Sequence, residues 1–408
     1  MSTTNSGPKA RELDEQTLDE VRKRIGIPLR YSPRNHNEVS STDSFRHFAR
    51  AYGDDNRLYN DPAYAAASSW GSPIAPPLYP FVSGIARPVE HSEVEQAILR
   101  ASDPLAGIGQ YMCGERWIFP KPIRVGDALW HSETLHSADL RTSEFGGGVG
   151  ALVSRRHCWE DVDGAPYALR FLDFWHADRA KSKKVGKNRQ IERTHYSDEQ
   201  IEQIEAVYEA EIVRGATPRT VADVAAGDAL GPIAKGPLSV TDIVAWHVGV
   251  GWGVYGGGTS RIAFRNRRRV PRFYVRNELG FFDSAQRCHW DDEWAQRMGH
   301  PGAYDYGVMR TNWMVHLVTD WMGDDAWIWK LSASVRKFNY LGDTHLVSGV
   351  VCDVDRGMGT ATIDVEGRNQ RGEVTCDARV VVLLPPTGGG PARIPDFDPS
   401  QIPEASAP

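Results

Sequence analysis

The sequence predicts an α+β protein built from two copies of one unit, and three observations support this prediction. A segment around His289 recurs in altered form around Tyr59. The apolar stretch 308–322 has the length and composition of a buried helix. Stretches that alternate apolar and polar residues follow each copy, which is typical of antiparallel strands. We therefore expect each unit to hold a few helical turns, one long apolar helix and a run of antiparallel strands.

The composition is that of an ordinary globular protein. The 408 residues are 41% hydrophobic and 25% charged, with a formal net charge of -6. This charge is too small and too mixed to indicate binding to nucleic acid or an anionic membrane, and no apolar run approaches a membrane span. The five cysteines are scattered without the spacing of metal ligands, which favours a reducing, cytoplasmic setting. We expect neither a metal ion nor another cofactor.

The chain divides into five stretches. The two folded units are expected over 41–177 and 220–386, where the repeated segments lie. A polar N-terminal extension precedes them over 1–40, and a charged linker with one solvated helix joins them over 178–219. The tail, 387–408, is rich in proline and glycine and is expected to be irregular.

Short helical segments open each unit. Residues 45–52 are expected to form a helix with Thr42 or Asp43 as its N-cap. A further helical turn begins at an aspartate in both copies, over 61–65 and over 291–295. The matching position of these turns supports the assignment of a repeat.

Strands are expected after the helical part of each unit. In both copies an aromatic strand runs into a Gly-Asp turn, at Gly126-Asp127 and at Gly342-Asp343. Further segments have the alternation of a strand: 151–154, 167–175, 346–353, 360–365 and 378–384.

Only the second copy of the repeated segment holds residues suited to acid–base chemistry. Gly307 lies eighteen residues after His289 and opens the apolar helix. In the first copy, Tyr59 replaces the histidine and Pro77 replaces the glycine. Proline has no N–H to donate, and a tyrosine with a free pKa near ~10 is a poor acid or base at neutral pH. We therefore expect the first unit to have lost catalysis.

The motif resembles that of a known family. Gly53-Asp54-Asp55-Asn56 with Asp61, and Pro73-Ile74 before Pro77, are similar to the motif of the MaoC-like, (R)-specific enoyl-CoA hydratase/dehydratase family in its double-hotdog form. The resemblance implies two hotdog domains in one chain, each an antiparallel sheet wrapped around a central helix, with a homodimer as a possible assembly. It implies interconversion of a 2-enoyl thioester and its 3-hydroxyacyl thioester, carried by coenzyme A or an acyl carrier.

The family pattern assigns three catalytic positions, one of which is displaced here. His289 would be the acid or base, and the N–H of Gly307 would stabilise an oxyanion. The family aspartate lies five residues before the histidine, where this chain has Ser284, and Asp283 lies one residue earlier. A one-residue bulge would bring the Asp283 carboxylate to the site.

If no such bulge forms, Asp291 or Asp305 would have to substitute, or the activity is not hydration. Hydration needs a carboxylate and a histidine around one water, so that one proton leaves the water and one reaches the α carbon. The enolate-like transition state places negative charge on the thioester oxygen. A backbone N–H at a helix start is a fixed dipole aimed at that charge.

Two further features are candidates for substrate binding. The loop before Gly307 is longer than in the first copy, and Tyr304 within it is expected to shape the pocket. The basic run Arg267-Arg268-Arg269 is either a solvated edge or a contact for the phosphates of coenzyme A, which arginine binds through paired hydrogen bonds. Two alternatives to hydration stay open: a thioesterase or specialised lyase, suggested by Ser284, and a non-catalytic subunit that binds acyl thioesters.

Overall fold

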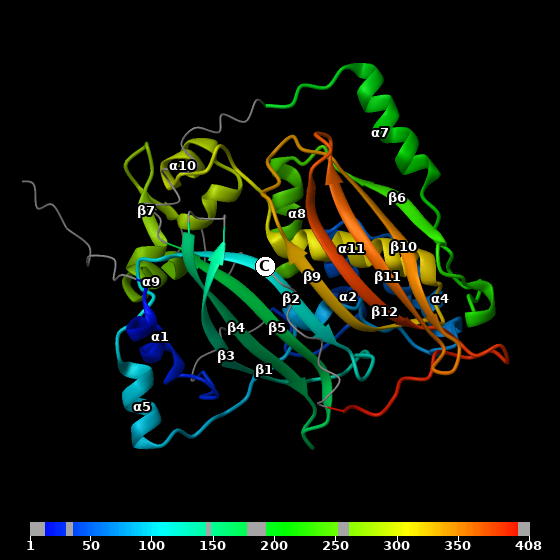
Figure 1. Ribbon diagram of the computed structural model, residues 1–408, viewed down its shortest axis with the longest axis horizontal. Helices are drawn as coiled ribbons and strands as arrows, with labels where there is room; N and C mark the ends of the chain where they lie inside the picture. Colours follow the sequence, from blue (N-terminus) through cyan, green and yellow to red (C-terminus); the bar gives the residue numbers. More distant parts are fainter. Residues whose placement is uncertain (1–12, 30–35, 144–147, 178–192, 252–260, 399–408) are drawn as a thin grey trace, which may run out of the picture.

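The computed structural model describes residues 13–29, 36–143, 148–177, 193–251 and 261–398. Its main feature is one ten-stranded sheet in the order β1-β3-β4-β5-β2-β9-β12-β11-β10-β6, which crosses the molecule in Figure 1. Residues 1–12 and 30–35 of the predicted N-terminal extension, residues 178–192 of the charged linker and the end of the tail lie outside the described residues.

The sheet has two halves that follow the order of the chain. The N-terminal half consists of β1 (Ile85–Ala86), β2 (Gly109–Ile118), β3 (Trp130–Ser143), β4 (Gly148–Glu160) and β5 (Pro166–Ala177). The C-terminal half consists of β6 (Ala229–Lys235), β9 (Trp327–Val335), β10 (His345–Asp355), β11 (Thr360–Asn369) and β12 (Val374–Leu383). Antiparallel pairing of β2 with β9 joins the halves into one sheet.

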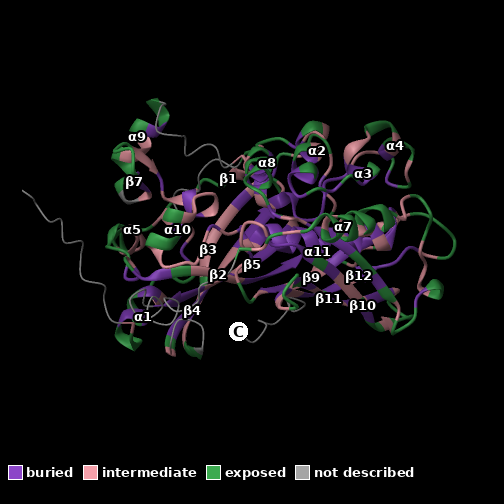
Figure 2. Ribbon diagram, turned by 90° about the horizontal axis from the view of Figure 1, so that it is seen from above, coloured by how far each residue is buried: buried purple, intermediate pink, exposed green. Residues whose placement is uncertain are grey.

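The long helix predicted in the second unit is α11 (Gly307–Met322), and it packs against β9, β10, β11 and β12. Met309, Trp313 and Leu317 are buried along it, as the helical spacing of these residues predicts. Figure 2 shows α11 as buried over most of its length. This half of the molecule is therefore a sheet wrapped around one central helix.

The inner face of the sheet is the face that α11 covers. A side chain at Gly307 would contact Val335, so Val335 and the alternate residue Ala333 point to this face. Ala333 is paired in register with Glu115 of β2, and paired residues of a sheet point to the same side. The inner face therefore continues from the C-terminal half onto the N-terminal half.

The first unit lacks the long apolar helix that the repeat predicts, and this prediction is wrong. After Pro77 the chain forms only the short 3₁₀ helix η1 (Tyr79–Val82). Prolines at positions 76, 77 and 80 remove backbone donors that a long helix needs. Instead α1 (Glu15–Arg22), from the N-terminal extension, packs on β3 and buries Leu18 and Val21 against Val153 and its neighbours.

The other helices surround the two ends of the sheet. They are α2 (Thr42–Ala51), α3 (Arg57–Asn60), α4 (Pro62–Ala67), α5 (Glu93–Arg100), α7 (Asp198–Ala210), η2 (Val221–Asp223), α8 (Val240–Val250), α9 (Arg261–Arg269), η4 (Pro271–Phe273), η5 (Ala285–His289) and α10 (Asp292–Met298). A small sheet of β7 (Tyr274–Arg276) and β8 (Phe282–Ser284) lies beside them. Among the described segments, no helix combines the length and the hydropathy of a membrane span.

Candidate active site

The N-terminus of α11 presents two backbone amides that have no hydrogen-bond partner among the described residues. Tyr306 is the N-cap residue, and its side chain does not cap the helix. The Met309 N–H donates to the Tyr306 carbonyl at 2.8 Å, whereas the amides of Gly307 and Val308 donate to no described residue. The first amides of a helix carry the positive end of its dipole. This helix start can therefore stabilise an oxygen on which negative charge develops.

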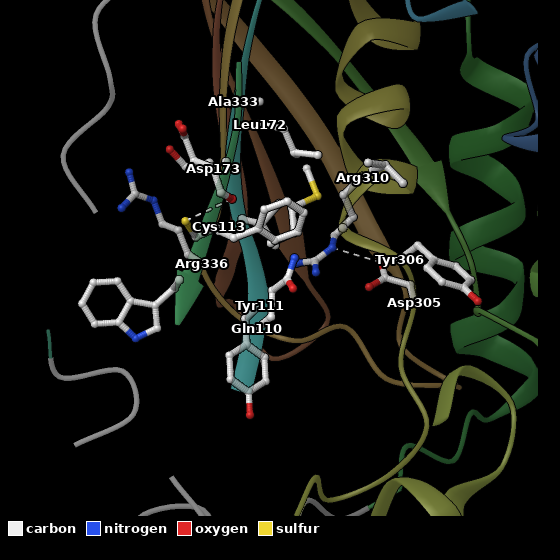
Figure 3. A pocket seen from close by; sticks show the side chains of 18 of the residues that line it. Gln110, Tyr111, Cys113, Leu172, Asp173, Asp305, Tyr306, Arg310, Ala333 and Arg336 are labelled. Atoms are coloured by element: carbon white, nitrogen blue, oxygen red, sulfur yellow. Dashed lines mark hydrogen bonds and ion pairs between the residues drawn. The ribbon is translucent and has the colours of Figure 1, made fainter. Parts of the chain in front are cut away.

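One cavity of about 520 Å³ brings this helix start together with His289. Residues 304–308 form one side of it, and Arg310 lines it one turn further along α11. Figure 3 shows Arg310 directed toward Asp305, which lies beside Tyr306. Three of the residues predicted from the sequence, His289, Tyr304 and Gly307, thus line the same cavity.

His289 is held in one tautomer and one orientation. Its Nδ1 lies 2.8 Å from the carbonyl oxygen of Tyr304, and because a carbonyl can only accept, Nδ1 carries the proton. The Tyr306 ring stacks on the imidazole with a centroid distance of 3.7 Å. Burial lowers the pKa of His289 to about 4, so the ring is neutral at pH 7. Its Nε2 lone pair is then available to accept a proton.

His247, which sequence reasoning did not single out, fixes the Tyr306 ring that stacks on His289. His247 of α8 lies with its Nε2 2.8 Å from the hydroxyl oxygen of Tyr306. The same imidazole contacts Trp290 edge-on, with centroids 5.5 Å apart. α8 therefore fixes the hydroxyl group of Tyr306, while the Tyr306 ring stacks on the imidazole of His289. Only the pairing of segments far apart in the sequence creates this support, so no local signal could have found it.

Asp305 supplies a buried carboxyl group to the cavity that His289 lines. It is 1% exposed, and its Oδ2 lies 3.0 Å from Arg310 Nε and accepts from Asn339 Nδ2 at 2.9 Å. Its Oδ1 makes no hydrogen bond with any described residue. Burial raises the pKa of Asp305 to about 6, against the opposing effect of Arg310. The group can therefore gain or lose a proton close to neutral pH.

Asp283 lies outside the cavity, contrary to the sequence expectation. It belongs to β8, whose register with β7 is continuous, so the bulge that would redirect its carboxylate is absent. Its Oδ1 accepts from the Ser284 N–H at 2.7 Å, and its Oδ2 lies 3.9 Å from Arg287. The carboxylate thus balances a buried arginine instead of facing His289.

The other two residues weighed for this position also have local structural roles. The Ser284 hydroxyl accepts from the Gln286 N–H at 3.1 Å and caps η5. The Asp291 carboxylate accepts from the Trp294 N–H at 2.9 Å and caps α10. Neither residue lines the cavity. Of the carboxylates considered in this region, only Asp305 shares the cavity with His289.

The three arginines proposed for coenzyme A lie on α9 and do not line the cavity. The guanidinium of Arg267 lies over the rings of Phe264 and Phe282, at 5.4 Å and 4.6 Å from their centroids. Arg268 and Arg269 are exposed. Contact of this helix with the phosphates of coenzyme A stays a prediction.

Comparison with known proteins bears on the family and the fold. Residues 30–170 match the model of the FAS1-like, dehydratase domain region. A UPF0336 protein from Streptomyces avermitilis is 30% identical over 110 residues, which are 26% of this chain and 67% of that protein. A solved structure described as a MaoC-like dehydratase superposes with a TM-score of 0.59 at 15% identity, over 89% of this chain and 99% of that one.

A second solved structure bears on the fold. A conserved hypothetical protein from Mycobacterium tuberculosis, described as having a double hotdog fold, superposes with a TM-score of 0.50 at 13% identity. It matches 88% of this chain and 96% of its own. The chain belongs to the family of the UPF0336 proteins. The predicted α+β, double-hotdog fold is thereby confirmed. The FAS1-like dehydratase region over residues 30–170 supports the predicted hydratase/dehydratase family.

The first copy of the motif is buried away from the cavity. Asp54 lies with its Oδ1 3.7 Å from Nε2 of His316 in the middle of α11, and an Asp320 oxygen lies 3.2 Å from the same nitrogen. Lys235 Nζ lies 2.7 Å from His316 Nδ1. Tyr59, at the motif histidine position, is also buried, and burial raises its pKa well above the ordinary value.

This buried cluster does not fit a metal ion. Ligand-type atoms of Asp54, His316 and Asp320 lie within 4.8 Å of one another. An ammonium group can only donate, so Lys235 makes Nδ1 of His316 the acceptor and leaves the ring proton on Nε2. A metal would need a lone pair at that nitrogen. The positive charge in this cluster comes from Lys235 instead of a metal ion. The contact between Asp54 and His316 joins the first copy of the motif to α11.

The floor of the cavity comes from the half of the sheet that lacks a central helix. On the inner face, Met112 of β2 is paired with Phe174 of β5, and a side chain at Gly307 would lie 3.1 Å from the Met112 sulfur. Leu172 and Arg170 follow at alternate positions of β5 and also line the cavity, as does Phe81 of η1. The cavity also includes residues from the outer face near the same strand ends: Tyr111, Arg116, Leu152, Asp173, Trp175, Ser334 and Arg336.

Proposed function

We propose that the protein hydrates a 2-enoyl thioester to a 3-hydroxyacyl thioester, or catalyses the reverse dehydration, with coenzyme A as the carrier. One observation supports this proposal above the others. The neutral His289 and the uncapped start of α11 line a single cavity. A proton acceptor and an oxyanion site in one cavity are what addition of water to a conjugated thioester requires.

The proposed reaction begins with the thioester oxygen at the N–H of Gly307. His289 Nε2 takes a proton from a water molecule, and the water oxygen forms a bond to the β carbon. The electron pair of the double bond moves toward the carbonyl, where the helix start stabilises the developing charge. The α carbon then takes a proton from the carboxyl group of Asp305. Proton return from His289 to Asp305 through solvent completes the cycle, and dehydration follows the same steps in reverse.

Asp305 replaces Asp283 in this proposal because of where the two carboxyl groups lie. Asp305 lines the cavity and keeps one oxygen without a hydrogen bond from a described residue. Asp283 is occupied by Ser284 and Arg287. Tyr304 keeps its proposed role, since its carbonyl orients His289 and its side chain lines the cavity.

The activity is tested with purified protein and crotonyl-CoA, followed by enoyl-CoAs of increasing chain length. We expect the absorbance of the conjugated enoyl group to disappear without release of free thiol. Thiol release would instead identify a thioesterase, and tight binding without turnover would identify a binding subunit. Either result would contradict the proposed function.

The pH dependence of kcat/KM tests the proton assignments. Burial lowers the pKa of His289 to about 4 and raises that of Asp305 to about 6. The reactive form has neutral His289 and protonated Asp305, so kcat/KM is expected to be highest between these values. It falls above pH 6 as Asp305 loses its proton and below pH 4 as His289 gains one.

Asp305→Asn provides the matched variant for this profile. We expect it to lose most activity, and its remaining activity to lack the decrease above pH 6. Stopped-flow rates in a series of buffers at constant ionic strength would measure both profiles. A wild-type rate that rises through pH 6 would show that the carboxylate, not the acid, is the reactive form.

A further inference from the structure

A line of inner-face residues leads from the helix start to a buried arginine. Met112 lies beside Gly307 and is paired with Phe174. From Phe174 the inner-face positions of β5 continue through Leu172 to Arg170, and all three residues line the cavity. Four residues of a strand span about 13 Å. An extended acyl chain of roughly ten carbons would cover this distance from the thioester.

Arg170 is an unusual residue for the wall of an apolar channel. It is 2% exposed, and its Nε donates to Glu115 Oε2 at 2.7 Å. The guanidinium lies 5.1 Å from the ring centroids of both Phe81 and Trp117. Its Nη1 donates to no residue in the described part of the chain. Because Arg170 lines the cavity, its guanidinium offers a fixed, charged donor to an acceptor that enters there.

A second polar side chain without a complete set of partners lies next to Arg170. His157 of β4 is paired with Arg170 in register and therefore points to the same face. Its Nδ1 lies 3.2 Å from His131 Nε2, but its Nε2 has no hydrogen-bond partner among the described residues. Burial lowers the pKa of His157 well below the usual value, so this second group is neutral.

We propose that this end of the cavity binds a neutral oxygen function on the acyl group, such as a ketone, ether or hydroxyl, through Arg170 with His157 beside it. The inference rests on the proposed function, because the thioester must lie at Gly307 for the acyl chain to follow β5. The oxygen would lie about 13 Å from the thioester carbonyl. Glu115 already balances the arginine charge, and a second anion buried there would be costly. This disfavours a carboxylate.

Two matched substrates test the proposal on the wild-type enzyme. 2-Dodecenoyl-CoA and its 11-oxo derivative differ only by a carbonyl group near the far end of the chain. A hydrogen bond to a buried charged donor corresponds to roughly a 10- to 100-fold gain in kcat/KM for the oxo substrate. Equal kcat/KM values, with both substrates hydrated, would refute the polar anchor and leave the proposed function intact. Failure to hydrate either substrate would refute the proposed function itself.

Two double variants then test whether Arg170 causes the preference for the oxo substrate. In Arg170→Met/Glu115→Gln both charges are removed together, so that no buried charge is left unpaired. We expect the oxo preference to fall to about one in this variant.

The control is Arg379→Met/Asp364→Asn, which removes an arginine–carboxylate pair, 2.7 Å apart, between β12 and β11 and outside the cavity. This control should keep the preference. Loss of preference in both variants, or retention in both, would overturn the role of Arg170.

Discussion

Replacing Gly307 by proline is expected to lower kcat for enoyl-CoA hydration by about 10²- to 10³-fold, the usual effect of removing one oxyanion donor. The substitution deletes the amide hydrogen and reproduces the residue that the first copy has at position 77. Proline is well tolerated at the first position of a helix. Tyr306, with φ -88° and ψ 131°, already has the extended conformation that proline requires of the preceding residue.

Gly307→Ala is the matched control for this substitution. Both variants add a Cβ, which would lie 3.1 Å from the Met112 sulfur and 3.3 Å from Val335, but alanine keeps the N–H. The difference in kcat between the two variants therefore reports the donor apart from the steric effect. Equal rates for both variants, with circular dichroism showing both folded, would contradict the assignment of the oxyanion site.

Replacing His289 by asparagine is expected to lower kcat/KM by about 10²- to 10⁴-fold, the range for loss of a general acid or base. The asparagine amide can still donate to the Tyr304 carbonyl, as Nδ1 of His289 does at 2.8 Å. It cannot accept a proton at the position of Nε2. The local hydrogen bond is kept while the chemistry is removed, and steady-state rates with crotonyl-CoA would measure the effect.

His300→Ala serves as the control for the histidine. His300 packs against the Tyr304 ring with centroids 4.7 Å apart, yet it does not line the cavity. We expect this variant to stay within a few-fold of wild type, since His300 lies outside the cavity. A His289→Asn enzyme as active as the His300→Ala enzyme would exclude His289 as the acid or base.

The residues that sequence analysis placed correctly were those fixed by local order along the chain. The spacing between His289 and Gly307 was enough to expect both at one helix start, because only the short helix α10 and one loop lie between them. Burial of Met309, Trp313 and Leu317 also followed from helical periodicity.

Other features depend on contacts that local order does not determine. Asp283 lies one residue before the position of the family aspartate. The uninterrupted β7–β8 pairing and the buried Arg287 hold its carboxylate outside the cavity. The repeat suggested a second long helix, whereas prolines in the first copy prevent it. Arg170 could not be assigned, because its place in the cavity depends on pairing between strands that are distant in sequence.

The proposed mechanism requires that one thioester binds between Gly307 and His289. A crystal structure of the His289→Asn enzyme with bound 2-enoyl-CoA would measure this directly. We expect the thioester oxygen at about 3 Å from the Gly307 nitrogen, with the β carbon facing the side chain at position 289. A thioester bound outside this cavity, or one whose carbonyl points away from the start of α11, would contradict the account.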